Sequence, residues 1–138
     1  MSSTAQLRKT VSRNGSESSS LSASIILNAL SDAVLVIVPD GAIHYANLAA
    51  EQFFSASADY LCRHSLEDFI PSDSPLFTLI RQLGVADSSL SENGVTLSGS
   101  RFGERLVNIH LAPIIDDTNR IVITLSEKSL AEKITRQL

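Results

Sequence analysis

The spacing of apolar residues changes several times along the chain, and each change predicts a new element. Apolar positions three and four residues apart predict a helix over 22–30. The uninterrupted apolar run 34–38 predicts a central strand that is covered on both faces. A turn over 39–41 and a second apolar segment, 42–46, complete a predicted β-hairpin. Asn47 follows at a position where its side chain can cap the next helix.

The middle of the chain predicts helices. Residues 58–64 and 66–70 predict short helical turns, and the second ends because Pro71 disfavours helical geometry in the residue before it. Ser74 followed by proline predicts the start of a longer helix, since proline is tolerated at the first helical position. We expect this helix to end at Gly84, because glycine commonly terminates helices.

The last third of the chain predicts strands. Residues 95–98 predict a short strand after a turn at 93–94. Apolar and polar residues then alternate over 104–115 and 121–126, on either side of a polar turn at 116–119, which predicts an antiparallel hairpin with one buried face. Strands at the two ends and helices between them predict an α+β domain with a single antiparallel five-stranded sheet, short helices on one face and a flanking helix at each terminus.

Composition divides the 138 residues into three parts. Residues 1–20 contain seven serines and few apolar residues, which predicts a disordered tail. Residues 21–127 form the predicted domain, including its flanking helix 22–31, and 128–138 begin a further helix. The tail carries a net charge of +2 and the remaining residues −6, which together give the formal charge of −4.

Composition also excludes several classes of function. A mildly acidic chain has no general attraction to nucleic acid or to anionic lipid, and Arg101 and Arg105 form no basic stripe. No run of 18 apolar residues is present, so we expect no membrane span. The single cysteine, Cys62, excludes an intrachain disulfide and predicts an intracellular setting.

Residues 24–127 resemble a PAS domain. The resemblance rests on the order and spacing of four segments, which are 26–36, 40–43, 46–51 and 65–71. It implies that residues 21–127 form a PAS sensor domain.

A narrower resemblance is to the sensor domains of the NtrB (GlnL) family of nitrogen-regulation histidine kinases. It is carried by 74–76, which follow Phe69-Ile70-Pro71, and by 111–114 and 131–138. In that family the closing segment leads into the helix with the phosphorylated histidine. The resemblance implies a cytoplasmic, dimeric kinase and phosphatase that acts on an NtrC-like response regulator and is controlled by a PII-type signal protein.

The chain itself lacks the motifs of kinase chemistry. A histidine kinase needs a histidine on a helix, usually followed by an acidic residue, and His44, His64 and His110 do not fit this pattern. A glycine-rich phosphate loop is also missing from the sequence. We therefore expect no enzymatic activity from these residues alone, and ATP and Mg²⁺ only in a kinase core beyond residue 138. Cys62 and His64 lack a second ligand pair, so we expect no metal site and a buried thiol.

Cofactor-binding PAS domains have recognisable residues that this chain lacks. Haem-binding members use a histidine on the long central helix, and 75–84 contains none. Flavin-binding members use a cysteine in an Asn-Cys-Arg-Phe context, which Cys62-Arg63 matches only in part. We expect neither cofactor. A PAS domain that senses a small apolar ligand or another cofactor stays open as an alternative function. Its pocket would be lined by residues that would otherwise fill the core, namely Phe53, Phe54, Phe69, Phe77 and Leu79.

Two flanking segments are candidates for dimer contacts and signal transmission. The first helix carries Ile25, Ile26, Ala29 and Leu30, which would cover the open face of the sheet in the same chain or in a partner subunit. The closing segment carries an apolar stripe of Leu130, Ile134 and Leu138, which suits a coiled coil. We hypothesise that the closing segment transmits a change in the domain to the kinase. A third possible function, beside the kinase module and the ligand-sensing domain, is a stand-alone PAS adaptor without a kinase.

Overall fold

The computed structural model describes residues 23, 25–86, 88–115 and 119–127. The predicted serine-rich tail, 1–20, and the closing segment 128–138 lie outside the described residues. The candidates Leu130, Ile134 and Leu138 therefore stay predictions.

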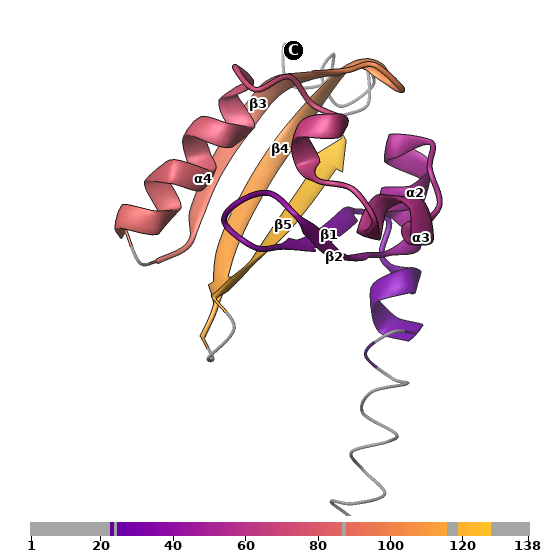
Figure 1. The fold of residues 1–138 in the computed structure, drawn as a ribbon, viewed down its shortest axis with the longest axis horizontal. Coiled ribbons are helices and arrows are strands. Elements are labelled where there is room, and N and C mark those ends of the chain that lie inside the picture. The colour runs from indigo at the N-terminus through magenta and orange to yellow at the C-terminus, as the bar shows by residue number, and fades with distance from the viewer. Residues whose placement is uncertain (1–22, 24, 87, 116–118, 128–138) are drawn as a thin grey trace, which may run out of the picture.

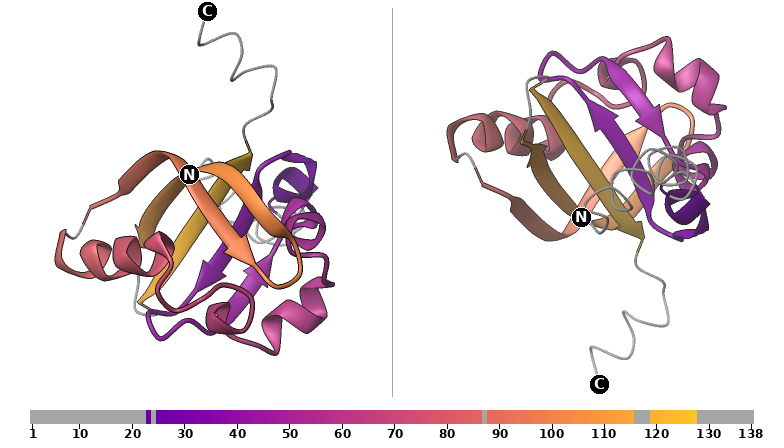
Figure 2. Two further views of the ribbon diagram at one scale, coloured as in Figure 1. Left: turned by 90° about the horizontal axis from the view of Figure 1, so that it is seen from above. Right: turned by 90° about the horizontal axis from the view of Figure 1, so that it is seen from below.

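Five antiparallel strands form one sheet in the order β2-β1-β5-β4-β3 (Figure 1). The first and last strands of the domain lie side by side in the middle of this sheet, as both views in Figure 2 show. This arrangement confirms the predicted α+β fold. The strands are β1 (Ala33–Ile37), β2 (Ile43–Ala46), β3 (Leu90–Gly99), β4 (Gly103–Ile114) and β5 (Arg120–Glu127).

The helices lie between β2 and β3 in the chain, and residues 25–29 form a helical turn before β1. Asn47 caps the helix that follows β2, as predicted, by accepting a hydrogen bond from the backbone N–H of Ala50 at 2.9 Å. Ser57 caps the next by accepting from Tyr60 N–H at 3.1 Å. The elements are α2 (Leu48–Phe54), α3 (Ala58–Cys62), the 3₁₀ turn η1 (Leu66–Asp68) and α4 (Pro75–Ala86).

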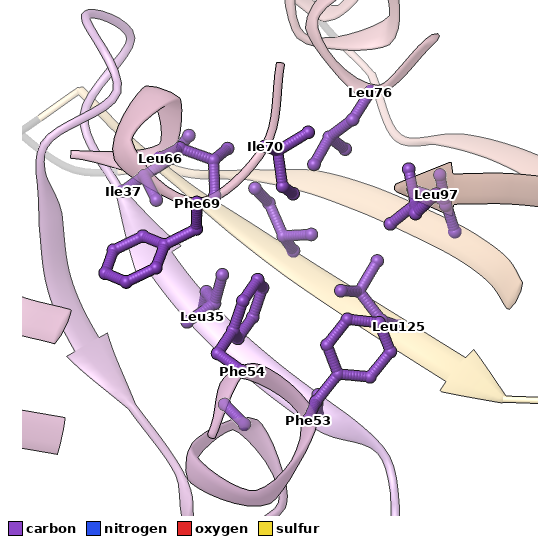
Figure 3. Packing of buried hydrophobic residues seen from close by; sticks show 14 of the residues in the cluster. Leu35, Ile37, Phe53, Phe54, Leu66, Phe69, Ile70, Leu76, Leu97 and Leu125 are labelled. Carbon is purple, nitrogen blue, oxygen red and sulfur yellow. The ribbon is translucent and has the colours of Figure 1, made fainter. Parts of the chain in front are cut away.

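Strand alternation builds the core. Alternate residues in the middle of β1, β4 and β5 point toward the helices and are buried, and Leu35, Ile109 and Ile123 are almost fully enclosed. Phenylalanines from α2 and from the segment after η1 close this core from the other side (Figure 3). On the opposite face Val34 is buried and Val36 is half-buried, so the predicted cover on both sides of β1 is only partial there.

Two turn predictions around glycine were wrong. Gly84 does not end its helix, because α4 continues to Ala86 and the buried Leu83 beside it keeps this turn packed against the sheet. Residues 93–94 do not precede the strand but form a bulge within β3, which begins at Leu90. Gly94 adopts a φ of +68° there, and its N–H donates to Asn108 Oδ1 at 2.9 Å, so the bulge is fastened to the neighbouring strand.

Candidate functional site

The predicted pocket residues belong to the packed core. Phe53, Phe54 and Phe69 are buried, and the Phe54 ring contacts both of the others, with its centroid 5.0 Å from that of Phe53 and 5.9 Å from that of Phe69. Figure 3 shows these rings facing Leu35 and the end of β5. The other two candidates lie apart from the rings on α4, where Phe77 is half-buried and Leu79 borders a surface groove of about 620 Å³ between α4 and β3.

A fourth phenylalanine, which sequence reasoning missed, completes the ring cluster. Phe102 comes from the turn between β3 and β4, and its ring centroid lies 4.8 Å from that of Phe53 and 5.5 Å from that of Phe54. Gly99 makes room for it, because a Cβ at this position would overlap the Phe102 ring. The sequence did offer a signal, because Phe102 is a large apolar residue between two predicted strands, where a turn is expected.

Arg101 fastens the same turn from outside. Its Nη1 donates to the carbonyl oxygen of Ser55 at 2.7 Å, and its guanidinium lies 4.9 Å from the centre of the Tyr60 ring. The turn between β3 and β4 is thus attached to α2 by the buried Phe102 ring and to the α2–α3 connection by Arg101.

Asn47 forms the junction between the N-terminal helical turn and the domain. Its side chain is fully buried, and Oδ1 accepts from the N–H groups of Val34 and Ala50, both at 2.9 Å. Its Nδ2 donates to the carbonyl oxygens of Leu27 at 2.7 Å and Asp32 at 3.1 Å. All four hydrogen-bonding positions of the amide are therefore used.

The candidate dimer residues on this helical turn face outward. Ile25 is 66% exposed and Ile26 is 59% exposed, and Leu30 and Ala29 are also exposed. The described part of the chain covers these side chains only in part. Of the two alternatives, packing of these side chains against the sheet of their own chain is not observed among the described residues, and packing in a partner subunit stays a prediction.

The face of the sheet opposite the helices carries apolar residues and the buried hydroxyl group of Tyr45. Val36 pairs with Val122 of β5 and with Tyr45 of β2. The Tyr45 hydroxyl is buried without a hydrogen-bond partner among the described residues, and burial raises the pKa of this phenol.

The inner rows of the sheet end in an ion pair at the start of β4 and the end of β5. Arg105 continues the row of Val107, and Glu127 continues the row of Leu125. Arg105 Nη1 lies 2.8 Å from Glu127 Oε2, and the guanidinium lies 5.5 Å from the centre of the Phe53 ring. Sequence reasoning noted Arg105 but missed its partner, because alternation indicates a face and not a register between strands.

The histidines lie in strands and a loop, not on helices. His44 is exposed on β2, and His110 is exposed on β4 with Nδ1 2.8 Å from Ser91 Oγ. His64 lies after α3, with its ring 4.2 Å from that of Tyr60. Within the described ranges, no three His, Cys, Asp or Glu side chains are grouped to hold a metal ion.

The predicted buried thiol was wrong, since Cys62 is exposed. In the five-residue helix α3 the buried position belongs to Leu61, and the next residue points about 100° away around the helix. Partial burial raises the pKa of the Cys62 thiol, and the nearby charge of Asp59 raises it further.

Comparisons with known proteins agree with this architecture. The family model described as the PAS fold matches residues 24–126. NtrB sensory histidine kinase/phosphatases are similar to the chain, with 41% identity for that of Rhizobium meliloti over 82% of the chain and 34% for that of Azospirillum brasilense over 83%. The chain spans only 30% and 29% of the length of these two relatives.

No helix in the described part of the chain is long and apolar enough to cross a membrane.

Solved structures of PAS domains are also similar to this chain. The PAS domain of nitrogen regulation protein NR(II) from Vibrio parahaemolyticus superposes with a TM-score of 0.67 at 27% identity, over 76% of this chain and 96% of that one. A PAS domain from a two-component sensor histidine kinase gives 0.65 at 20% identity, over 82% of this chain and 99% of that one, and shows the fold alone. From the family match, the sheet order and the packed helices together, we conclude that the chain belongs to the PAS family.

Proposed function

We propose that this chain is the regulatory PAS module of an NtrB-type sensor histidine kinase and phosphatase, in which it acts as sensor and dimerisation unit. The observation that carries the proposal is 41% identity to the R. meliloti NtrB protein over 82% of the chain. The NR(II) PAS structure supports it through a similar fold at 27% identity.

The proposal assigns phosphate chemistry to a segment outside these residues. None of the three histidines lies on a helix, where a phosphate-accepting histidine is needed. ATP and Mg²⁺ would bind a kinase core that follows residue 138 in the full-length protein. That protein would phosphorylate an NtrC-like response regulator in the cytoplasm under the control of a PII-type protein.

Dimerisation is proposed through the N-terminal helical turn. Ile25, Ile26 and Leu30 expose large apolar side chains, which is unfavourable in water unless another surface covers them. The hydrogen bonds from Asn47 Nδ2 to the Leu27 carbonyl oxygen and from the Leu48 N–H to Asn28 Oδ1 attach this turn to the core. A second copy of the same turn is the proposed cover, because related sensor kinases act as dimers.

Signal output is proposed through β5. This strand lies in the centre of the sheet and ends at Glu127, directly before the segment with Leu130, Ile134 and Leu138. A change in the core or in the dimer contact would alter the direction in which this segment leaves the domain.

The alternative function is a PAS domain that senses a small apolar ligand or a cofactor. The rings of Phe53, Phe54, Phe69 and Phe102 pack together in the interior where such a ligand would lie, which favours the regulatory module. An absorbance spectrum and mass spectrometry of material released from purified protein distinguish the two functions. A stoichiometric released ligand would favour the alternative.

The decisive experiment starts from the gene beyond codon 138. We expect it to encode a phosphate-accepting histidine and an ATP-binding domain. The full-length protein should autophosphorylate with labelled ATP and transfer phosphate to an NtrC-like regulator, while residues 1–138 alone should not. A stop codon at this point, or a downstream domain of another class, would overturn the proposal.

A further inference from the structure

A small cavity lies where the inner face of the sheet ends. It has a volume of about 180 Å³ and opens between α2, the beginning of β1 and the ends of β4 and β5. This volume equals that of roughly six water molecules in the liquid, which suits a ligand of only a few carbon atoms. Its apolar walls include Ala49, Phe53 and Leu125, and its polar lining includes Gln52, Arg105 and Glu127.

The Arg105 guanidinium is only partly used at this cavity. Among the described residues it makes one hydrogen bond, from Nη1 to Glu127 Oε2 at 2.8 Å, although a guanidinium has five N–H donors. The Phe53 ring, 5.5 Å away, supports one side of it, and about a third of the side chain is exposed. Arginine in this state can form two parallel hydrogen bonds with an incoming carboxylate.

We propose that this cavity binds a short carboxylate ligand, which pairs with Arg105 in place of Glu127. Gln52 supplies a second polar group, because its side-chain amide forms no hydrogen bond with the described residues and lines the same space. The small side chain of Ala49 leaves room for the ligand body against Phe53. The site lies at the strand ends and borders the ring cluster of the interior through Phe53.

Glu127 acts as an internal competitor at this site. It is the last residue of β5, and its carboxylate already occupies the position that a ligand carboxylate would take. Two carboxylates at one guanidinium in this small space would repel each other, so a ligand carboxylate competes with the Arg105–Glu127 contact. If the proposed function holds, binding would release the end of β5 directly before the output segment; the binding itself does not depend on that function.

The test is a titration of the complete 138-residue chain with sodium succinate, followed by amide chemical shifts at constant ionic strength. Succinamide, which has the same shape without charge, is the matched ligand control. We expect saturable shifts at the residues around the cavity with succinate and none with succinamide. Arg105→Gln and Ala49→Leu should abolish them, while Arg81→Gln, which removes the same charge from the exposed face of α4, should leave them unchanged.

Glu127→Gln gives the sharpest outcome, because it should tighten succinate binding by about two- to fivefold, the gain expected from losing an exposed competing ion pair. Thermal melts of each variant show that it is folded. The proposal is overturned if neither wild type nor Glu127→Gln shows saturable shifts at millimolar succinate, or if Arg105→Gln binds as well as wild type. These results leave the kinase assignment intact, since phosphorylation tests that separately.

Discussion

Asn47 holds the N-terminal helical turn to the domain through Leu27, whose carbonyl oxygen accepts a hydrogen bond from Asn47 Nδ2 at 2.7 Å. The same amide caps α2 and binds the first residues of β1. Asn28 adds a second link, because its Oδ1 accepts from the N–H of Leu48 at 2.9 Å. The proposed dimer surface is therefore fixed to the core by two asparagine side chains.

Replacing Asn47 by alanine should destabilise the domain strongly. The change removes a hydrogen-bond partner from the Val34 N–H and from the carbonyl oxygens of Leu27 and Asp32, and it removes the cap of α2. We therefore expect a loss of about 2–4 kcal/mol in the free energy of unfolding. Urea denaturation measures it. Asn28→Ala, at an exposed position, is the matched control and should cost about 1 kcal/mol or less. An equal loss in both variants would contradict the central role of Asn47.

Phe102→Ala should cost about 3–5 kcal/mol, as expected for a buried phenylalanine truncated to leave a cavity. Phe77→Ala, which removes the same atoms from a half-buried position, should cost clearly less. Chemical denaturation of the two variants gives the comparison. If Phe102→Ala proved the milder change, the turn between β3 and β4 would not be anchored in the core as described.

The double variant Ile25→Glu, Ile26→Glu should shift the chain toward monomer. Charges on both sides of a dimer contact would repel and would lose their water on association. Analytical ultracentrifugation over a range of concentrations measures the shift. Ile115→Glu, at a residue that is 95% exposed elsewhere on the domain, is the control and should leave the association unchanged. An unchanged dimer in the double variant would remove this helical turn from the interface.

Leu130→Glu with Ile134→Glu should uncouple the domain from the kinase in the full-length protein. We expect autophosphorylation to persist and its regulation to be lost, because the apolar stripe is the proposed path to the catalytic segment. Phosphorylation assays with and without the regulatory PII-type protein measure this. Intact dimerisation and intact regulation together would rule the path out.

The Cys62 thiol should react slowly with iodoacetamide for an exposed cysteine. Partial burial raises its pKa above the ordinary value and Asp59 adds to this, so less thiolate is present at a given pH. Folding favours the neutral thiol, and this contribution to stability is lost as the pH rises through the raised pKa. Asp59→Asn should lower the pKa part of the way and speed alkylation at pH 8. The same rate in both proteins would exclude an effect of Asp59.

Local patterns predicted most of the fold. Alternation over 104–115 and 121–126 placed the two long strands, and the capping role of Asn47 followed from its position before α2. These features depend on neighbours within a few residues. The sequence pattern therefore determines them without knowledge of the rest of the molecule.

The errors and omissions concern contacts between distant segments. The bonds from Asn47 to Leu27 and Asp32, and the ion pair between Arg105 and Glu127, join elements whose relative register no local pattern specifies. Phe102 was missed because turn residues are usually exposed. Cys62 was misplaced because a helix of five residues has too few positions to define its buried side.

The central pairing of β1 with β5 imposes an order on the folding of the chain. Ala33 pairs with Leu125, so a strand made early in translation waits for one that leaves the ribosome near the end of the domain. Until then β1 has an open edge of unpaired backbone groups, which other chains can bind. We expect slow, all-or-none folding that begins only after β5 emerges, and a nascent chain that depends on chaperones until that moment.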